Sequence, residues 1–318
     1  MNIKLNNMVI DFLKNKQYQC VKIDNSCTEG HGHTLSVKVV MPTFCQANCP
    51  FCFNKLTRET QKHNWELFKE NLHMSLRNIL ENANNREISL DITGNEPTFN
   101  IQEFASFMKT LDFYKNIIYP GKIDKIVLTT NGYHLYECIP FMKGVVDIVN
   151  ISLHKCNYED RINLFRTKYI PSNEDLKSVN ILLAKNNIKS TSVAVVAHEC
   201  NFKNFVENFV RFSKEVGFVD TRIRIDFTTF NPLIKNMFNV IFKDDEVINI
   251  QNGLSSKYFD IDGFSVSIYS GVPELIDYVI GVEMVIDDNG LIYLDYNKKL
   301  PLSIEDIKLF DQNIYIIN

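Results

Sequence analysis

Three cysteines that lie close together are the residues of this chain best suited to hold a metal cluster. Cys45, Cys49 and Cys52 fall within eight residues and are spaced C-x3-C-x2-C. Cysteine thiolates are the usual ligands of iron–sulfur clusters, and electron-transfer clusters are normally closed by four of them. Three thiolates would hold three corners of a cubic [4Fe-4S] cluster and leave the fourth iron open. The spacing therefore predicts a cluster at which a ligand from outside the protein binds.

Two other interpretations of these cysteines fit less well. A structural zinc site uses four tetrahedral ligands, usually as two close pairs, and the next candidate, His63, stands alone eleven residues after Cys52. Disulfides would leave one of the three cysteines over, and no secretory signal precedes them. The remaining cysteines are scattered, as buried thiols of a core usually are: Cys20, Cys27, Cys138, Cys156 and Cys200.

From residue 35 onward, short apolar runs alternate with amphipathic stretches, which indicates strands alternating with helices. Helical spacing is clearest from Trp65 to Leu80, where apolar residues recur at three- and four-residue steps. Such β-α repeats imply a parallel sheet with right-handed crossovers. A closed eight-stranded barrel typically needs ~250 residues, so an α/β fold with a partial (β/α)6 TIM-like barrel is expected. Its six strands are expected near 35–41, 88–93, 126–130, 145–153, 192–197 and 223–227.

The pattern changes after about residue 240. Residues 259–269 alternate as one strand would, and the runs 284–286 and 291–294 flank Asn289-Gly290, a pair that tolerates the positive φ angles of a tight hairpin turn. A short helix is expected near 304–310. The chain is therefore divided into an N-terminal extension (1–33), a barrel (34–240) and a β-rich cap without cysteines (241–318).

Polar motifs follow the second, third and fourth expected strands at their carboxyl ends, where barrel enzymes carry their chemistry. They are Gly94-Asn95-Glu96-Pro97, Thr129-Thr130-Asn131-Gly132 and Ser152-Leu153-His154. A glutamate in a turn fixed by proline offers an acceptor to an ammonium group, and serine can bond a hydroxyl. Each motif also has a purely structural interpretation. Glu-Pro is favourable in a turn before a helix, Asn-Gly forms a common turn, and a histidine at a strand end can have a structural role.

The cysteine spacing and these motifs together resemble the radical S-adenosylmethionine (SAM) superfamily, over residues 35 to about 230. Residues 94–97 resemble the family's Gly-Gly-Glu-Pro motif, with Asn95 in place of the second glycine. The resemblance implies that SAM binds the open iron of a [4Fe-4S] cluster held by Cys45, Cys49 and Cys52. The SAM contacts that it implies are Phe51 near adenine, Gly94, Asn95, Glu96 and Pro97 near the amino group, Asn131, Ser152 at the ribose with His154 nearby, and Arg166 or Arg161 at the carboxylate.

The resemblance further implies that SAM is cleaved reductively to a 5′-deoxyadenosyl radical, which abstracts hydrogen from a substrate. A small polar substrate is expected, and the electron would come from an external donor such as flavodoxin or ferredoxin. A peptide-modifying enzyme is the alternative, and Cys52-Phe53 also resembles viperin-like enzymes that act on nucleotides. The non-enzyme hypothesis is an iron–sulfur sensor, which would need a fourth protein ligand.

Composition and charge limit the kinds of partner and cellular compartment that fit this protein. The 318 residues are 45% hydrophobic, enough for a large core, and carry a net charge of −4 from mixed signs, which argues against a nucleic-acid partner. No run approaches the ~18 apolar residues of a membrane helix. Reduced cysteines without a targeting segment indicate the cytoplasm, and a low-potential cluster indicates anaerobic conditions. His31 and His33 flank a glycine and are expected to lie in a solvated loop rather than a metal site.

Overall fold

The computed structural model describes residues 34–52, 64–82, 87–196, 202–225, 249–251, 254–261, 264–271, 283–293 and 301. Three predicted features lie outside the described residues. They are the N-terminal extension with His31 and His33, the lone His63, and the short helix near 304–310.

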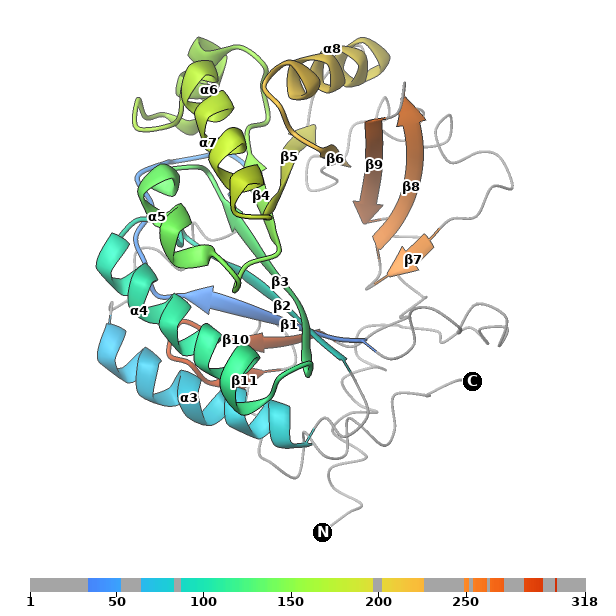
Figure 1. Ribbon diagram of the computed structural model, residues 1–318. Coiled ribbons are helices and arrows are strands. Elements are labelled where there is room, and N and C mark those ends of the chain that lie inside the picture. Colours follow the sequence, from blue (N-terminus) through green and yellow to red (C-terminus); the bar gives the residue numbers. More distant parts are fainter. Residues whose placement is uncertain are drawn as a thin grey trace.

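An open, mostly parallel sheet forms the frame of the molecule (Figure 1). Its strands are β1 (Thr34–Met41), β2 (Glu87–Gly94), β3 (Ile123–Thr130), β4 (Ile148–Ser152), β5 (Lys189–Val196), β6 (Asp220–Ile225), β7 (Asn249–Gln251), β8 (Leu254–Ile261), β9 (Phe264–Gly271), β10 (Glu283–Ile286) and β11 (Ile292–Tyr293). Their spatial order is β11-β10-β1-β2-β3-β4-β5-β6-β9-β8-β7. Strands β1 to β6 are parallel and neighbour one another in chain order, which confirms the predicted partial barrel.

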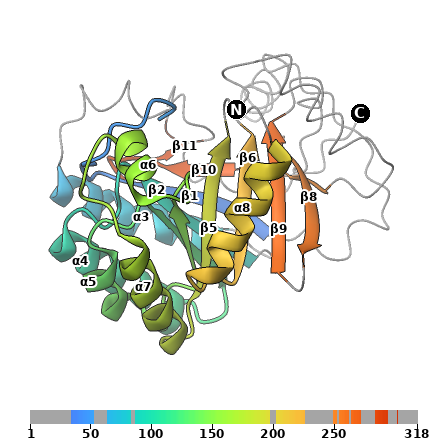
Figure 2. The same ribbon diagram turned by 90° about the horizontal axis from the view of Figure 1, so that it is seen from above.

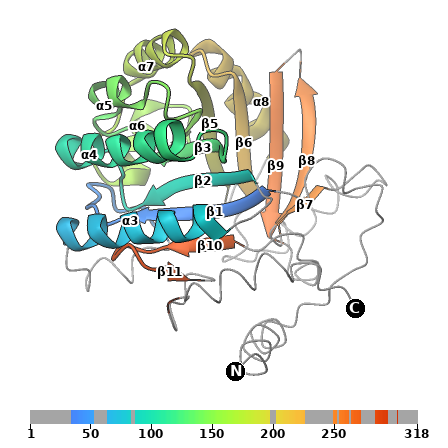
Figure 3. The ribbon, with the colours of Figure 1, turned by 60° about the horizontal axis from the view of Figure 1, so that its bottom comes forward.

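Helices connect the parallel strands and cover the convex face of the sheet (Figures 2 and 3). They are α3 (Trp65–Asn82), α4 (Ile101–Asp112) with its π-helical continuation η2 (Phe113–Ile118), α5 (Leu135–Met142), α6 (Tyr158–Phe165), α7 (Asn173–Lys185) and α8 (Phe202–Glu215). The expected core face of α3 is confirmed, because Phe68, Leu72 and Leu76 are buried. The helical region between β4 and β5 is interrupted before Ser172, the N-cap of α7, as Pro171 predicts.

The two faces of the sheet differ in chemistry. Side chains toward the helices, such as Val39, Ile92 and Leu128, belong to one continuous apolar core. The opposite face carries polar side chains among apolar ones. One row across β3 to β6 pairs Thr129 with Asn150, Asn150 with Thr191, and Thr191 with Asp220. Because paired residues of neighbouring strands point to the same face, these four side chains line the inside of the partial barrel.

Strands from the C-terminal region extend both edges of this sheet. β9 pairs in parallel with β6, and β10 pairs in parallel with β1. The single strand expected over 259–269 was wrong, because β8 and β9 are the two antiparallel arms of a hairpin. In the sequence the alternation runs on from one arm into the other, so periodicity alone does not separate the two strands. The domain boundary near residue 240 stays a prediction.

The hairpin of β10 and β11 confirms the Asn289-Gly290 prediction. Val285 pairs with Tyr293, and Gly290 has a φ of +79°. This turn packs against α3, because the Ser75 hydroxyl donates to the Gly290 carbonyl at 2.6 Å and the Asn71 amide donates to the Asn289 carbonyl at 2.8 Å. A Cβ on Gly290 would lie 2.5 Å from the Phe68 carbonyl oxygen, so only glycine fits there.

Within the described part of the chain, no helix is both long enough and apolar enough to cross a membrane.

Candidate active site

The three clustered cysteines lie in the loop that directly follows β1. None of the three forms a disulfide; Cys49 is buried, and Cys45 and Cys52 are half-buried. Backbone bonds fix the loop: the Asn48 amide donates to the Phe165 carbonyl at 2.8 Å, and the Cys52 amide donates to the Cys49 carbonyl at 3.3 Å. The loop is therefore held against the end of α6, and the disulfide alternative is excluded for these three cysteines.

The environment of the cysteines fits a [4Fe-4S] cluster better than a single ion. Cys45, Cys49 and Cys52 lie in a small apolar cluster with Phe165 and Ile170, which shields them from water on one side. Among the described residues, no three Cys, His, Asp or Glu side chains converge to hold one metal ion. A zinc ion needs every sulfur ~2.3 Å from one point, whereas the cysteines of a cubic cluster each bind a different iron.

The turn after β2 packs directly on the cysteine loop. Gly94 has a φ of +130°, and a Cβ there would lie 2.9 Å from the Met41 carbonyl oxygen, at the end of β1. The Asn95 side-chain amide donates to the Thr43 carbonyl at 2.6 Å, and the Glu96 amide donates to the Phe44 carbonyl at 3.2 Å. The predicted SAM-binding turn and the predicted cluster loop are thus neighbours held by hydrogen bonds.

The carboxylate of Glu96 is buried and bonded within the protein. Its Oε1 accepts from the Thr130 hydroxyl at 2.5 Å and from the Thr98 hydroxyl at 2.6 Å and amide at 3.1 Å, while its Oε2 accepts from the Asn131 amide at 2.7 Å. Burial raises the pKa of Glu96, although these hydrogen bonds act in the opposite direction. The side chain therefore ties the turn after β2 to the turn after β3, and its contact with SAM stays a prediction.

Asn131 joins the turn after β3 to the cysteine loop. Its Oδ1 accepts from the Gln46 side-chain amide at 2.9 Å and from the Tyr133 backbone amide at 3.1 Å, and its Nδ2 donates to the Cys45 Sγ at 3.6 Å. Gly132 follows with a φ of +91°, and a Cβ there would lie 2.8 Å from the Pro171 ring. The Asn-Gly pair is therefore fixed in a position that faces the cysteines.

His154, just after β4, packs against Phe51 of the cysteine loop. The His154 ring contacts the Phe51 ring edge to face at 4.8 Å and the Phe165 ring at 5.4 Å, and its Nδ1 accepts from the Val195 amide at 3.0 Å. Burial lowers the pKa of His154 to about 3, with a smaller contribution from Lys155, so the ring is neutral. Phe51 packs in the same apolar cluster as the cysteines, so His154 lies next to that cluster.

The two candidate arginines have different surroundings. Arg161 is fully buried, and its guanidinium donates to the Cys156 carbonyl at 2.7 Å and to the Asn173 Oδ1 at 2.7 Å. Burial lowers the pKa of Arg161 to about 10. Arg166 is exposed at the end of α6, next to Phe165, whose carbonyl holds the cysteine loop. Arg161 therefore supports the loop between α6 and α7, and Arg166 stays the candidate for the SAM carboxylate.

Ser152 ends β4 on the inner face of the sheet, with its side chain half-buried. The register pairs Ser152 with Val193, Val193 with Arg222, and Arg222 with Ser267. Arg222 is half-buried, and none of the carboxylates in the described ranges forms an ion pair with it. A cation that is partly removed from water and forms no ion pair among the described residues is suited to receive an anionic ligand.

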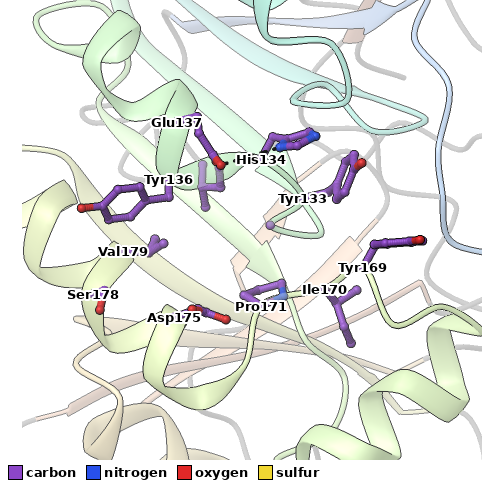
Figure 4. Close-up of a pocket in the computed structure, with 12 residues that line it drawn as sticks. Tyr133, His134, Tyr136, Glu137, Tyr169, Ile170, Pro171, Asp175, Ser178 and Val179 are labelled. Carbon is purple, nitrogen blue, oxygen red and sulfur yellow. Dashed lines mark ion pairs between the residues drawn. The ribbon is translucent and has the colours of Figure 1, made fainter.

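A separate cavity of about 500 Å³ lies outside the barrel, between the start of α5 and the start of α7 (Figure 4). Tyr133 and Tyr169 lie on one side of it, and His134 faces Glu137 at 3.8 Å. Gln46 of the cysteine loop donates to the Tyr169 carbonyl at 3.0 Å. The cavity is therefore a neighbour of the cysteine loop and does not enclose it.

Several residues of this site were not predicted from the sequence. Gln46 lies between the first two cysteines, Thr98 follows the turn at residues 94–97, and Phe165 precedes Arg166. Thr130 belongs to a predicted motif, but its bond to Glu96 was not predicted. Their positions next to the motifs are the signal that was available. The Thr130 hydroxyl bonds to a residue 34 positions away along the chain, and the Asn131 side chain bonds to one 86 positions away. Such pairings appear only in the folded structure.

Comparisons with known proteins agree with this geometry. The family model of the radical SAM superfamily matches residues 39–212. The structure of Streptococcus suis SuiB bound to S-adenosylmethionine is 14% identical, with a TM-score of 0.54 over 98% of this chain and 77% of that chain. SuiB bound to its precursor peptide SuiA is 15% identical, with a TM-score of 0.54 over 96% of this chain and 68% of that chain. The structure of anSMEcpe with bound AdoMet is 16% identical, with a TM-score of 0.55 over 90% and 81%. No curated protein matches the chain.

Proposed function

The chain belongs to the radical SAM superfamily, and from this premise we propose that it abstracts a hydrogen atom from a small polar substrate. Members of the family are enzymes that use a [4Fe-4S] cluster and SAM. When bound together, these two groups supply an electron and a 5′-deoxyadenosyl radical. The protein has to hold both groups in contact, orient the substrate and keep water out.

The observation that carries this proposal is the joining of three loops at one end of the sheet. The turn at Gly94 to Pro97 bonds to Phe44 of the cysteine loop, and Asn131 bonds to Cys45. In this arrangement Cys45, Cys49 and Cys52 would hold the cluster. The backbone of residues 94–97 would receive the SAM amino group, and Arg166 would receive its carboxylate, because a guanidinium binds a carboxylate in a bidentate way.

The polar side chains of the inner face support a small anionic substrate. Arg222 lies two residues along β6 from Asp220, so their side chains are about 7 Å apart on one face. Buried oxygens of Asn150, Thr191 and Asp220 have no hydrogen-bond partner within the described residues. Such groups favour a ligand that combines a carboxylate or phosphate with hydrogen-bond donors. We therefore propose that Arg222 binds the anionic group of the substrate.

A peptide substrate is the second candidate. It is favoured by the solved structures of SuiB bound to precursor peptide SuiA and of anSMEcpe bound to the peptide Cp18Cys, which share this fold. An external electron donor such as flavodoxin or ferredoxin, and an anaerobic cytoplasmic setting, belong to either version of the proposal.

The test of the reaction is anaerobic. The cluster is reconstituted, SAM and dithionite are added, and 5′-deoxyadenosine is measured in wild type and in Cys49→Ala. Release that depends on Cys49 is expected. An intact four-iron cluster whose spectrum does not change when SAM is added would contradict the enzyme proposal and favour a sensor.

The substrate class is tested separately on the cluster-loaded, SAM-bound protein. Binding of inorganic phosphate and of succinate is measured by calorimetry in wild type, Arg222→Met and Arg224→Met. Arg224 is the comparison, because it lies two residues further along the same face of β6 but is exposed, so the two variants separate the half-buried arginine from its exposed neighbour. We expect weak binding that Arg222→Met abolishes and Arg224→Met retains. Equal binding by both variants would exclude Arg222 as the anion site and leave the peptide candidate.

A further inference from the structure

The side-chain amide of Asn131 is held against a cysteine that the proposed function assigns to the cluster. Asn131 is 7% exposed, and its Nδ2 lies 3.6 Å from the Cys45 Sγ. We infer that Asn131 is a positioning residue that raises the reduction potential of the cluster through this N–H···S bond. The inference rests on the proposed function, because it requires Cys45 to be a cluster ligand.

The orientation of the Asn131 amide follows from its other partners. Its oxygen accepts from the backbone amide of Tyr133 at 3.1 Å, and a backbone amide can only donate. The same oxygen accepts from the Gln46 Nε2, and the second bond of that nitrogen goes to the Tyr169 carbonyl, which can only accept. Two independent neighbours therefore identify the oxygen of Asn131, so its nitrogen is the atom that faces the sulfur.

The backbone of Asn131 is fixed as firmly as its side chain. Its amide donates to the Oε2 of the buried Glu96 at 2.7 Å, and Gly132 is confined by the ring of Pro171. An amide held on both sides loses little conformational entropy when it donates to the sulfur. The donor is therefore preorganised to face Cys45.

The sign of the effect follows from charge. A reduced cluster carries one more negative charge than an oxidised one, and hydrogen bonds to the cluster sulfurs are among the factors that set its potential. An N–H donor stabilises the more negative form more strongly, and partial burial increases this difference because the local dielectric is low. The bond to Cys45 should therefore make the cluster easier to reduce, which matters for an enzyme that must be reduced before it can cleave SAM.

The experiment compares midpoint potentials of reconstituted wild type, Asn131→Leu and Gln46→Leu by redox titration followed by electron paramagnetic resonance. Leucine branches at the same carbon as asparagine but has no hydrogen-bond donor. We expect a more negative potential in Asn131→Leu at unchanged iron and sulfide content. Gln46→Leu removes a bond to Asn131 but none to sulfur, so its potential should lie between the other two. Equal potentials in wild type and Asn131→Leu would overturn the inference.

A second measurement covers the case in which Asn131→Leu does not assemble a cluster. Wild-type protein labelled with ¹⁵N in asparagine side chains is reduced and studied by pulsed electron paramagnetic resonance. A ¹⁵N hyperfine coupling at the cluster is expected from Nδ2 of Asn131, and its absence would contradict the bond to Cys45. Failure of the proposed function would look different, because wild type would then lack a four-iron signal or a response to SAM.

Discussion

The buried imidazole of His154 makes the stability of the fold depend on pH. Its Nδ1 accepts the Val195 amide, and burial lowers its pKa to about 3 from an ordinary value of 6.5. A group whose pKa is lower in the folded state contributes stability above its unfolded pKa and loses it as the pH falls. The free energy of unfolding should therefore fall below pH 6.5, by up to about 1.4 kcal/mol per pH unit.

This is tested by urea denaturation between pH 7 and pH 5, where most carboxylates stay ionised. His154→Asn is the control, since its side-chain oxygen is attached to Cγ as Nδ1 is, and can still accept from Val195 but does not titrate. The wild type should lose stability across this range relative to His154→Asn. Parallel pH profiles for the two proteins would show that His154 is not the titrating group.

At the scale of residues, the sequence was enough to predict the cluster cysteines but not the hydrogen bonds that fix the surrounding loops. The spacing of Cys45, Cys49 and Cys52 predicted the cluster loop, because cluster ligands from one short loop are a local feature. The buried contacts of Glu96 and the bond from Asn131 to Cys45 were not predictable. Both depend on residues distant in the chain, and a motif does not reveal which polar atom another loop will occupy.

At the scale of elements, the end of β2 depends on Gly94. Alanine at position 94 would combine a φ of +130° with a Cβ 2.9 Å from the Met41 carbonyl and 3.0 Å from its amide nitrogen. Gly121 also has a positive φ, +81°, but a Cβ there would meet nothing within 4 Å. Gly121→Ala should therefore lower the free energy of unfolding only by the cost of holding alanine at a positive φ, about 1–2 kcal/mol. Gly94→Ala should lower it by roughly 1–3 kcal/mol more, because the backbones of β1 and β2 must move apart.

The measurement is urea denaturation of both variants, together with SAM affinity of the reconstituted proteins. We expect Gly94→Ala to weaken SAM binding, since the displaced turn is the one proposed to receive its amino group, and Gly121→Ala to bind normally. If both variants lost equal stability and bound SAM equally, the close contact between Gly94 and Met41 would be unimportant.

Periodicity predicted the elements well but not all of their partners. The six parallel strands and the core face of α3 follow from local spacing of apolar residues. The parallel pairing of β9 with β6 and of β10 with β1 was not predicted. A strand's alternation shows that it has two different faces, but it carries no information on which edge of which sheet will receive it.

At the scale of the whole molecule, the β10–β11 hairpin joins parts of the chain that are far apart in sequence, because β10 pairs with β1 and the hairpin turn packs on α3. Gly290 approaches the Phe68 carbonyl and the Leu72 amide so closely that a Cβ would lie 2.5 Å and 2.8 Å from them. Gly290→Ala should therefore separate the hairpin from α3 and expose it to limited proteolysis. Gly144→Ala is the matched control, because Gly144 has a similar φ of +74° and open space around it.

We expect Gly290→Ala to lower the free energy of unfolding by more than the roughly 1–2 kcal/mol that holding alanine at a positive φ costs the control. Early cleavage within residues 283–293 should accompany this loss. Equal stability and equal cleavage in the two variants would mean that the hairpin does not depend on its contact with α3.

The pairing of β10 with β1 also has a consequence for how the protein is made. β1 is among the first parts of the described chain to leave the ribosome, whereas its neighbour β10 is made only after the rest of the parallel sheet. Until then β1 presents an unpaired strand edge, which other nascent chains can join. The cysteine loop begins at the end of this same strand. Any factor that covers the exposed edge of β1 during synthesis would therefore have to leave before, or make room for, the proteins that deliver iron to the adjacent loop.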